Sequence, residues 1–425
     1  MDFDRKTLTC YFAEFTEFGF MDKERLAQKI CEKLQSKGYV AYYAGGYVRD
    51  LILKIHSDDI DIATDAAPET VQSLFEKTIP VGLSFGIVVV VEGGISFEIA
   101  TFRKDLHYKD GRRPEEIAFC SAKEDAHRRD FTINGMFYDP IHKKFFDYVG
   151  GKKDIEKGIL RAIGDPKVRF AEDRLRMVRA CRFSARFDFP IEEATKKAIL
   201  EQAHELFPAV SIERVYQEFK KMKSSCFKKA LTLLFEMNLL QQIFPKIKDY
   251  SPAKFKQCLE AFKQMPKESP TILYLLDLFP EITKNELEEM LDYLKVSNAR
   301  AKLALFCFET KHTIHKNLTK TERVKLYANP DIELVLKVIA ASLPSNEYAA
   351  FLKENAQHQK DLQNAIKRQI TNSPVVTSKF LMDHGVIPGK KLGKLLEKAE
   401  EIAIEQDLDN PEIILKKLHQ LPIWG

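Results

Sequence analysis

The chain has 425 residues, which is too long for one compact core and suggests about three domains, since domains average roughly 150 residues. Its 45% hydrophobic and 30% charged residues are typical of a globular protein and exclude an intrinsically disordered chain. The net charge of +4, from 66 basic and 62 acidic side chains, excludes a uniformly basic protein, so any nucleic-acid site must come from a local concentration of charge.

Membrane attachment is not expected from this sequence. The longest markedly apolar run, Phe85 to Val91, is far shorter than the ~20 residues of a membrane-spanning helix. The first residues lack the basic and apolar regions of a signal peptide, so we expect a cytoplasmic protein. Seven scattered cysteines without a Cys-x-x-Cys pair favour buried reduced thiols over a zinc site.

The first predicted elements form a strand, a glycine turn and two flanking helices. Apolar residues at helical spacing predict a helix from Asp22 to Gly38. Tyr39 to Ala44 predicts a strand, Gly45-Gly46 ends it, and Val48 to Ile55 predicts the next helix. Glycines at such a turn let backbone N–H groups approach an anion, and Arg49 adds a donor fork for phosphate. Taken alone, these residues also fit a tight turn with a surface arginine.

Short β-rich segments follow before the character of the chain changes. Ile60 to Ala63, Gly86 to Val91 and Ser96 to Thr101 predict strands, and a hairpin turn joins the last two. The charged segment Arg103 to Glu116 predicts a mobile loop. After Asp165, Leu-, Lys- and Glu-rich helical patterns continue to the C-terminus. The sequence therefore predicts an α/β half with a mixed sheet, followed by an all-α half.

Two aspartates in the second predicted strand are candidate metal ligands. Asp59 and Asp61 lie two residues apart, so their side chains project from the same face of a strand. Convergent carboxylates repel one another unless a cation lies between them, and oxygen ligands suit Mg²⁺. Alone, the pair fits a solvated strand end equally well. Together with a phosphate-binding turn, it meets the requirements of nucleotidyl transfer.

A further polar block, from Arg128 to Met136, contains additional candidate contacts to a nucleotide. Arg129 could bind a triphosphate, while Asp130 and Asn134 could bind ribose hydroxyls. A salt-bridged helix start explains the same residues equally well.

Basic residues concentrate between Arg161 and Pro190, where there are eight Arg or Lys but only four Asp or Glu. One acidic and three basic side chains recur there at every third position: Asp173, Arg176, Arg179 and Arg182. On one helix this spacing gives a slowly winding stripe, on which Asp173 and Arg176 are neighbours and Arg182 lies on the opposite side.

Asp173 and Arg176 could together read the edge of a base. An aspartate accepts from an exocyclic amine while an arginine donates to the adjacent ring nitrogen. Cytosine and adenine have that pattern and uracil and guanine do not, so the pair should admit CTP and ATP and exclude UTP and GTP. The alternative is an exposed ion pair on a helix, worth a few tenths of a kcal/mol.

Five ordered motifs together resemble the class II tRNA nucleotidyltransferase and bacterial poly(A) polymerase family. The motifs are Gly45 to Asp50, Asp59 to Thr64, Ala100 to Arg103, Arg128 to Met136 and Glu172 to Arg176. A weaker similarity lies at Gly385 to Gly393. One departure is Gly135, where the family more often has Ala, and we expect it to loosen a helix start.

The resemblance implies a polymerase-β-like nucleotidyltransferase head at residues 1–164, a helical neck that binds the nucleotide base and RNA at 165–250, and a helical body and tail that bind tRNA at 251–425. It also implies template-independent addition of the 3′-terminal CCA to tRNA from CTP and ATP. The reaction would be a two-metal nucleotidyl transfer with Mg²⁺ that releases pyrophosphate.

Site residues follow from the resemblance by position. Asp59 and Asp61 match the family's catalytic metal ligands, and Glu98, expected on a neighbouring strand, is a third candidate ligand. The residues that match the family's nucleotide contacts are Gly46, Arg49, Arg129, Asp173, Arg176, Arg179 and Arg182.

Several other functions remain open. A poly(A) polymerase shares the chemistry of the head, although Pro80 to Gly86 and the charged loop favour the tRNA branch. A CC-adding enzyme would lack the final adenosine step. A non-catalytic RNA-binding protein on the same scaffold would have lost a metal carboxylate, and a small-molecule nucleotidyltransferase would not need the long Lys-rich helical half.

Overall fold

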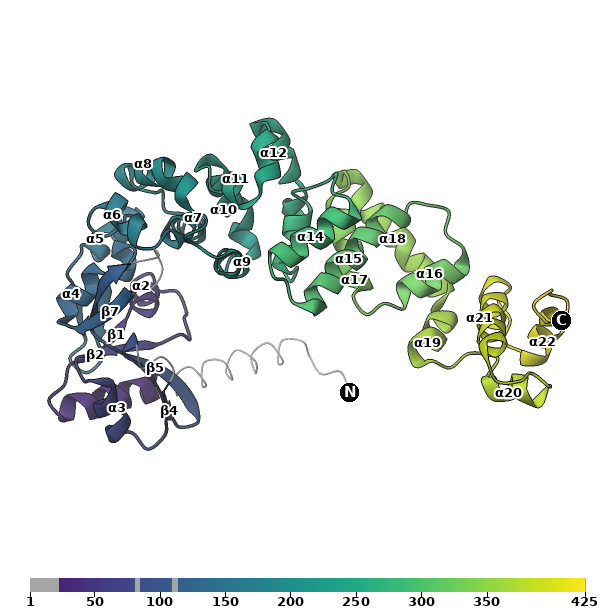
Figure 1. Cartoon of the computed structure of the whole chain (residues 1–425), viewed down its shortest axis with the longest axis horizontal. Helices are drawn as coiled ribbons and strands as arrows, with labels where there is room; N and C mark the ends of the chain where they lie inside the picture. The colour runs from purple at the N-terminus through teal and green to yellow at the C-terminus, as the bar shows by residue number, and fades with distance from the viewer. Residues whose placement is uncertain (1–22, 81–84, 109–113, 425) are drawn as a thin grey trace, which may run out of the picture. The chain divides into compact units, whose positions relative to one another are not determined.

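Figure 1 shows a computed structural model of the chain, which describes residues 23–80, 85–108 and 114–424. The chain divides into two compact units, Met1–Lys248 and Asp249–Gly425. No helix in the described ranges is long and apolar enough to cross a membrane. Every cysteine in these ranges carries a free thiol, and Cys10 lies outside them.

The first unit is built on a seven-stranded mixed sheet of order β3-β4-β5-β2-β1-β8-β9. Its strands are β1 (Ala41–Ala44), β2 (Asp61–Thr64), β3 (Thr78–Ile79), β4 (Ile87–Glu92), β5 (Ile95–Thr101), β8 (Met136–Asp139) and β9 (Lys144–Asp147). Only the β2–β5 pair is parallel, with Ile62 opposite Ile99, and the other pairs in this sheet are antiparallel. Both of these isoleucines are buried, as expected for β-branched side chains on the core face of a sheet.

The structure confirms the predicted strands and the turns between them. A helix covers residues 23–36, and Gly38 ends it with φ +88°, while Asp22 lies outside the described residues. β4 and β5 form the expected hairpin, whose two turn residues Gly93 and Gly94 have φ of +55° and +81°. Positive φ at both central residues is the conformation that a two-residue hairpin turn requires.

The prediction of a loop from Arg103 to Glu116 is wrong. This segment begins an antiparallel ribbon of β6 (Arg103–Tyr108) and β7 (Pro114–Phe119), with Arg103 opposite Phe119. Strand pairing is made by backbone groups, so a strongly charged sequence with no apolar alternation does not reveal it. Residues 109–113 of the predicted loop, and residues 81–84 of the segment Pro80 to Gly86 that favoured the tRNA branch, lie outside the described residues.

Helices surround the sheet and continue beyond it in the first unit. They are α2 (Gly46–Ile52), α3 (Pro68–Leu74), α4 (Ala122–His127), α5 (Gly151–Lys157), α6 (Pro166–Glu172), α7 (Leu175–Phe187), α8 (Glu193–Gln202), α9 (Ile212–Lys220), α10 (Ser224–Glu236) and α11 (Leu240–Ile243).

One predicted feature is wrong here, because the helix expected to run through Asp173 is broken. Asp173 has φ −151° and separates α6 from α7.

The second unit is helical throughout its described residues, as predicted. Its helices are α12 (Pro252–Cys258), α13 (Thr271–Leu276), α14 (Lys284–Tyr293), α15 (Asn298–Thr313), α16 (Lys320–Tyr327), α17 (Ile332–Ala341), α18 (Ser345–Asp361), α19 (Gln363–Thr371), α20 (Ser378–Asp383), α21 (Lys390–Glu405) and α22 (Pro411–Leu418). The last three share an apolar core that includes Leu381, Leu395 and Ile414. Trp424 packs against that core, with its ring 4.1 Å from the ring of His419.

Candidate active site

The glycine turn between β1 and α2 forms one wall of a cavity of about 390 Å³. Gly45 has φ +65°, a conformation that side chains rarely adopt. A Cβ atom at this position would also lie 2.9 Å from Nη1 of Arg129. Gly45 therefore permits both the tight turn and the close approach of an arginine to the backbone.

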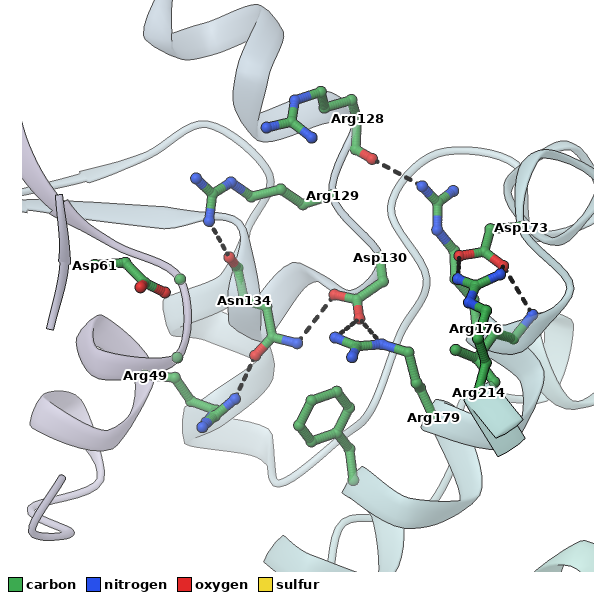
Figure 2. Close-up of a pocket in the computed structure, with 14 residues that line it drawn as sticks. Arg49, Asp61, Arg128, Arg129, Asp130, Asn134, Asp173, Arg176, Arg179 and Arg214 are labelled. Carbon is green, nitrogen blue, oxygen red and sulfur yellow. Dashed lines mark hydrogen bonds and ion pairs between the residues drawn. The ribbon is translucent and has the colours of Figure 1, made fainter. Parts of the chain in front are cut away.

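Arg49 lines this cavity, but its guanidinium is already engaged. It lies 2.8 Å from Asp50, donates to the side-chain oxygen of Asn134, and is only 3% exposed. Its planar group also faces the rings of Phe187 and Phe183, at 4.5 and 5.3 Å from their centroids. We expected Arg49 to present free N–H donors to a phosphate. In the structure its guanidinium is instead buried and largely paired, although it lines the cavity (Figure 2).

The acidic residues predicted as metal ligands gather at the start of β2. Asp61 is the first residue of that strand and lines the cavity, whereas Asp59 and Glu98 are exposed. Burial raises the pKa of Asp61 to about 6, and the negative charges of Asp59 and Glu98 add to this effect. Asp59 and Glu98 are therefore close enough to Asp61 to repel its charge, but Asp59 lies before β2 begins and not within a strand as predicted.

These carboxylates fit a cation that is shared with a substrate. Within the described ranges, no group of three or more His, Cys, Asp or Glu side chains is arranged to hold a metal ion by itself. Mg²⁺ in phosphoryl-transfer sites is usually held by one or two carboxylates and completed by substrate phosphates and water. The donor set at Asp61 and Asp59 matches that incomplete type of site.

Arg129, Asp130 and Asn134 form a connected polar wall between the end of α4 and a short 3-10 helix at Thr132–Asn134. Arg129 follows the end of α4 and donates twice to Asp125, at 3.0 and 3.1 Å. Asn134 donates to Asp130 at 3.0 Å, and Arg179 donates to the same carboxylate at 2.6 and 2.9 Å. Burial alone would raise the pKa of Asp130, but Arg179 and Asn134 outweigh it and lower the pKa to about 2. Asp130 is therefore an ionised anchor for Arg179.

Asp173 lies in the same cavity as Arg176 but is paired with a different arginine. Arg214, on α9, donates to both carboxylate oxygens of Asp173, at 2.8 and 3.2 Å. Arg176 instead donates to Glu172 and to the backbone oxygens of Arg169 and Arg128. Figure 2 shows Asp173 held from one side by Arg214 while both line the cavity.

Arg214 is the residue that sequence reasoning missed. It lies 41 residues after Asp173, on another helix, and no local motif marks it. The available signal was the start of a strongly amphipathic helix that carries an arginine in its first turn. Such a signal does not show that Arg214 pairs with Asp173.

Arg182 is the one predicted nucleotide contact that does not line the cavity. Its Nε donates to Glu218 at 2.6 Å, and both side chains are almost fully buried. Glu218 also lies 3.6 Å from Nη1 of Arg179, which does line the cavity. Arg182 is therefore placed to support Arg179 through Glu218, and a direct nucleotide contact stays a prediction.

More basic than acidic side chains line the cavity. Six arginines line it against three aspartates: Arg49, Arg128, Arg129, Arg176, Arg179 and Arg214 against Asp61, Asp130 and Asp173. Its volume is within the range of small-molecule sites, which is roughly 300–1,000 Å³. A polyanion that carries a group able to pair with Asp173 is the ligand that this lining complements.

Two family models match the chain around this cavity. The model described as "Poly A polymerase head domain" matches residues 41–161, which include the sheet and the acidic site. The model described as "Probable RNA and SrmB- binding site of polymerase A" matches residues 188–251. These matches and the cavity define the class of protein as a polymerase-type nucleotidyltransferase.

Relatives along nearly the whole chain define the family. The chain is 33% identical to a CCA-adding enzyme of Lactobacillus helveticus over 93% of this chain and 96% of that protein. It is 42% identical to a CCA-adding enzyme of Bacillus pumilus over 60% of each chain. A solved structure of the Bacillus stearothermophilus CCA-adding enzyme in complex with CTP has a TM-score of 0.77 at 28% identity, and covers 93% of this chain and 98% of its own. The chain therefore belongs to the CCA-adding enzyme family, and it is a tRNA nucleotidyltransferase.

Proposed function

We propose that this enzyme adds the 3′-terminal CCA sequence to tRNA from CTP and ATP, without a nucleic-acid template and with release of pyrophosphate. The observation that carries the proposal is the single cavity in which Asp61, the glycine turn and six arginines surround the space beside Asp173. The names of the relatives and the CTP complex of the Bacillus stearothermophilus enzyme support the choice of reaction.

The phosphate end of the nucleotide would lie between the glycine turn and Arg129. Arg129 lines the cavity close to Gly45, so its guanidinium is placed to contact a phosphate at the turn. Backbone N–H groups at the glycine turn add donors without adding bulk. These contacts would orient the α-phosphate toward Asp61, which lines the same cavity.

Asp59 and Asp61 would hold two Mg²⁺ ions, with Glu98 beside them. Bound Mg²⁺ would activate the attacking 3′-hydroxyl and neutralise charge on the phosphates and on the leaving pyrophosphate. The repulsion that raises the pKa of Asp61 supports this proposal, because a cation would relieve it.

The base end of the nucleotide would lie at Asp173 and Arg176. Arg214 donates to both oxygens of Asp173 and would fix its orientation, so the carboxylate could accept from the exocyclic amine of cytosine or adenine. Arg176 would donate to the neighbouring ring nitrogen. Uracil and guanine present a carbonyl where the amine is needed, so UTP and GTP would be rejected.

The test is extension of a tRNA that lacks its CCA end, with Mg²⁺, CTP and ATP, followed by sequencing of the products. Addition of C, C and A followed by arrest is the expected result. A long adenosine tail would instead assign a poly(A) polymerase, two cytidines alone would assign a CC-adding enzyme, and no extension would favour a non-catalytic RNA-binding protein. The control is Asp61→Ala, which should abolish incorporation while leaving tRNA affinity nearly intact.

A further inference from the structure

A second cavity, of about 560 Å³, adjoins the nucleotide cavity on the other side of Arg128. Lys104 on β6, Lys123 on α4, and Arg169 on α6 contribute to its lining. Arg128 lines both cavities, and its backbone oxygen accepts from Arg176 of the nucleotide cavity at 3.2 Å. The two spaces are therefore separated by little more than one residue.

The acidic side chains of this second cavity are already satisfied by the protein. Glu124 accepts from the backbone N–H and the hydroxyl of Ser121, at 3.1 and 2.9 Å, as part of the cap of α4. Glu172 accepts from Arg169 at 2.8 Å and also from Arg176. Glu172 is therefore paired with two arginines, whereas Glu124 is exposed and leaves one negative charge near the lysines.

The remaining charge of the lining is positive. Two arginines of the lining, Arg128 and Arg169, match its two carboxylates, Glu124 and Glu172, in number. Lys104 and Lys123 are exposed and add one positive charge each. A cavity of this charge attracts an anion, and its exposed lysines suit the oxygens of a solvated phosphate chain.

We propose that this second cavity binds the backbone phosphates of the unpaired 3′-terminal nucleotides of the RNA, with Lys104 and Lys123 as phosphate contacts. The inference rests on the proposed function, since a transferase must hold an RNA end next to its nucleoside triphosphate. The nucleotide cavity accounts for the triphosphate and the base of the incoming nucleotide. The adjoining cavity then accounts for the second substrate.

The experiment compares the full-length enzyme with Lys104→Gln/Lys123→Gln. The Michaelis constant for tRNA lacking CCA should rise roughly tenfold at moderate salt, and the slope of log affinity against log salt should fall by about 1.4, which is ~0.7 per lost contact to a single strand. The Michaelis constant for CTP should not change. Lys104→Arg/Lys123→Arg keeps both charges and should retain wild-type affinity for RNA.

The matched control is Lys152→Gln/Lys153→Gln on α5, which removes the same charge from exposed residues that line neither cavity. If both glutamine variants change RNA affinity equally, the inference is wrong. A rise in the Michaelis constant for CTP alone would assign the cavity to the triphosphate and would also overturn it. Equilibrium binding of a single-stranded oligoribonucleotide, measured without CTP, keeps this test separate from a failure of catalysis.

Discussion

Two aspartates in the nucleotide cavity are each fixed by an arginine from a distant part of the chain. Asp130 is held by Arg179, 49 residues away, and Asp173 by Arg214, 41 residues away. An unpaired carboxylate in this partly buried space would carry a large desolvation cost. The arginines remove that cost and fix the orientation of the acceptor oxygens before a nucleotide arrives.

The role of Asp173 in base selection can be tested through Arg214. We expect Asp173→Ala to relax selection against UTP by roughly tenfold to a hundredfold, because a well-placed polar pair discriminates bases by ~1–3 kcal/mol. Arg214→Gln should shift selectivity in the same direction, since it frees the carboxylate to move. Competition between CTP and UTP during extension measures both. Arg174→Gln is the control, because Arg174 pairs with Glu205 and neither residue lines the cavity. This variant should keep wild-type selectivity.

Glu218 should position Arg179 for the nucleotide. Glu218→Gln removes the carboxylate that lies between Arg179 and Arg182, so we expect a higher Michaelis constant for CTP. It should also lower the free energy of unfolding by about 3–5 kcal/mol, because Arg182 is left as an uncompensated buried charge. Urea unfolding and initial-rate kinetics measure the two effects.

A second substitution separates these two effects. Glu218→Gln/Arg182→Met removes the whole buried pair and should recover most of the lost stability, because apolar replacement of a buried pair is often neutral. The Michaelis constant for CTP should stay high, because Arg179 is still without its second carboxylate. If affinity for CTP returns together with stability, Glu218 has only a structural role.

At the scale of elements, Gly135 is the one residue between η2 (Thr132–Asn134) and β8, and it is closely packed. A Cβ atom here would lie 2.7 Å from Cγ2 of Val149 and 3.0 Å from Cδ1 of Ile163. Gly135 ends a short 3-10 helix, so the expectation that it loosens a helix start is wrong. The glycine instead makes room for the side chain of Val149.

We therefore expect Gly135→Ala to lower the free energy of unfolding by roughly 1–3 kcal/mol, which is the usual cost of overpacking. Val149→Ala should relieve the clash, so the double variant should be more stable than the sum of the single effects predicts. A double-mutant cycle in urea measures this coupling. Gly393→Ala, where a Cβ would meet nothing within 4 Å on helix α21, should leave stability unchanged or increase it. An additive cycle would contradict the proposed contact.

Local patterns predicted most of the first unit but not the connections across it. The β1–turn–α2 segment and the β4–β5 hairpin follow from apolar alternation and glycine placement, which act over a few residues. The break between α6 and α7 at Asp173 does not follow from local patterns. The Asp173 carboxylate accepts from the backbone N–H of Leu175 and pairs with Arg214, which is a tertiary contact. The cavity residues that the sequence analysis singled out lie in short contiguous motifs. Arg214 and Glu218, which pair with residues of those motifs, lie on another helix, α9.

At the scale of the whole molecule, the nucleotide cavity belongs to one unit. All of its lining residues lie between Gly45 and Arg214, within the unit Met1–Lys248. We expect a fragment of residues 1–248 to bind CTP with the dissociation constant of the full chain, as measured by isothermal titration calorimetry. Its affinity for tRNA should be much weaker, since the helical unit 249–425 is then missing. Full tRNA affinity in the fragment would remove the second unit from RNA binding.

The chain has one tryptophan, Trp424, which lies in the tail. Its ring contacts the ring of His419. Intrinsic indole fluorescence therefore comes from the last helices alone. Because Trp424 packs against the core of α20, α21 and α22, a change in its emission on addition of tRNA would report a rearrangement of these helices.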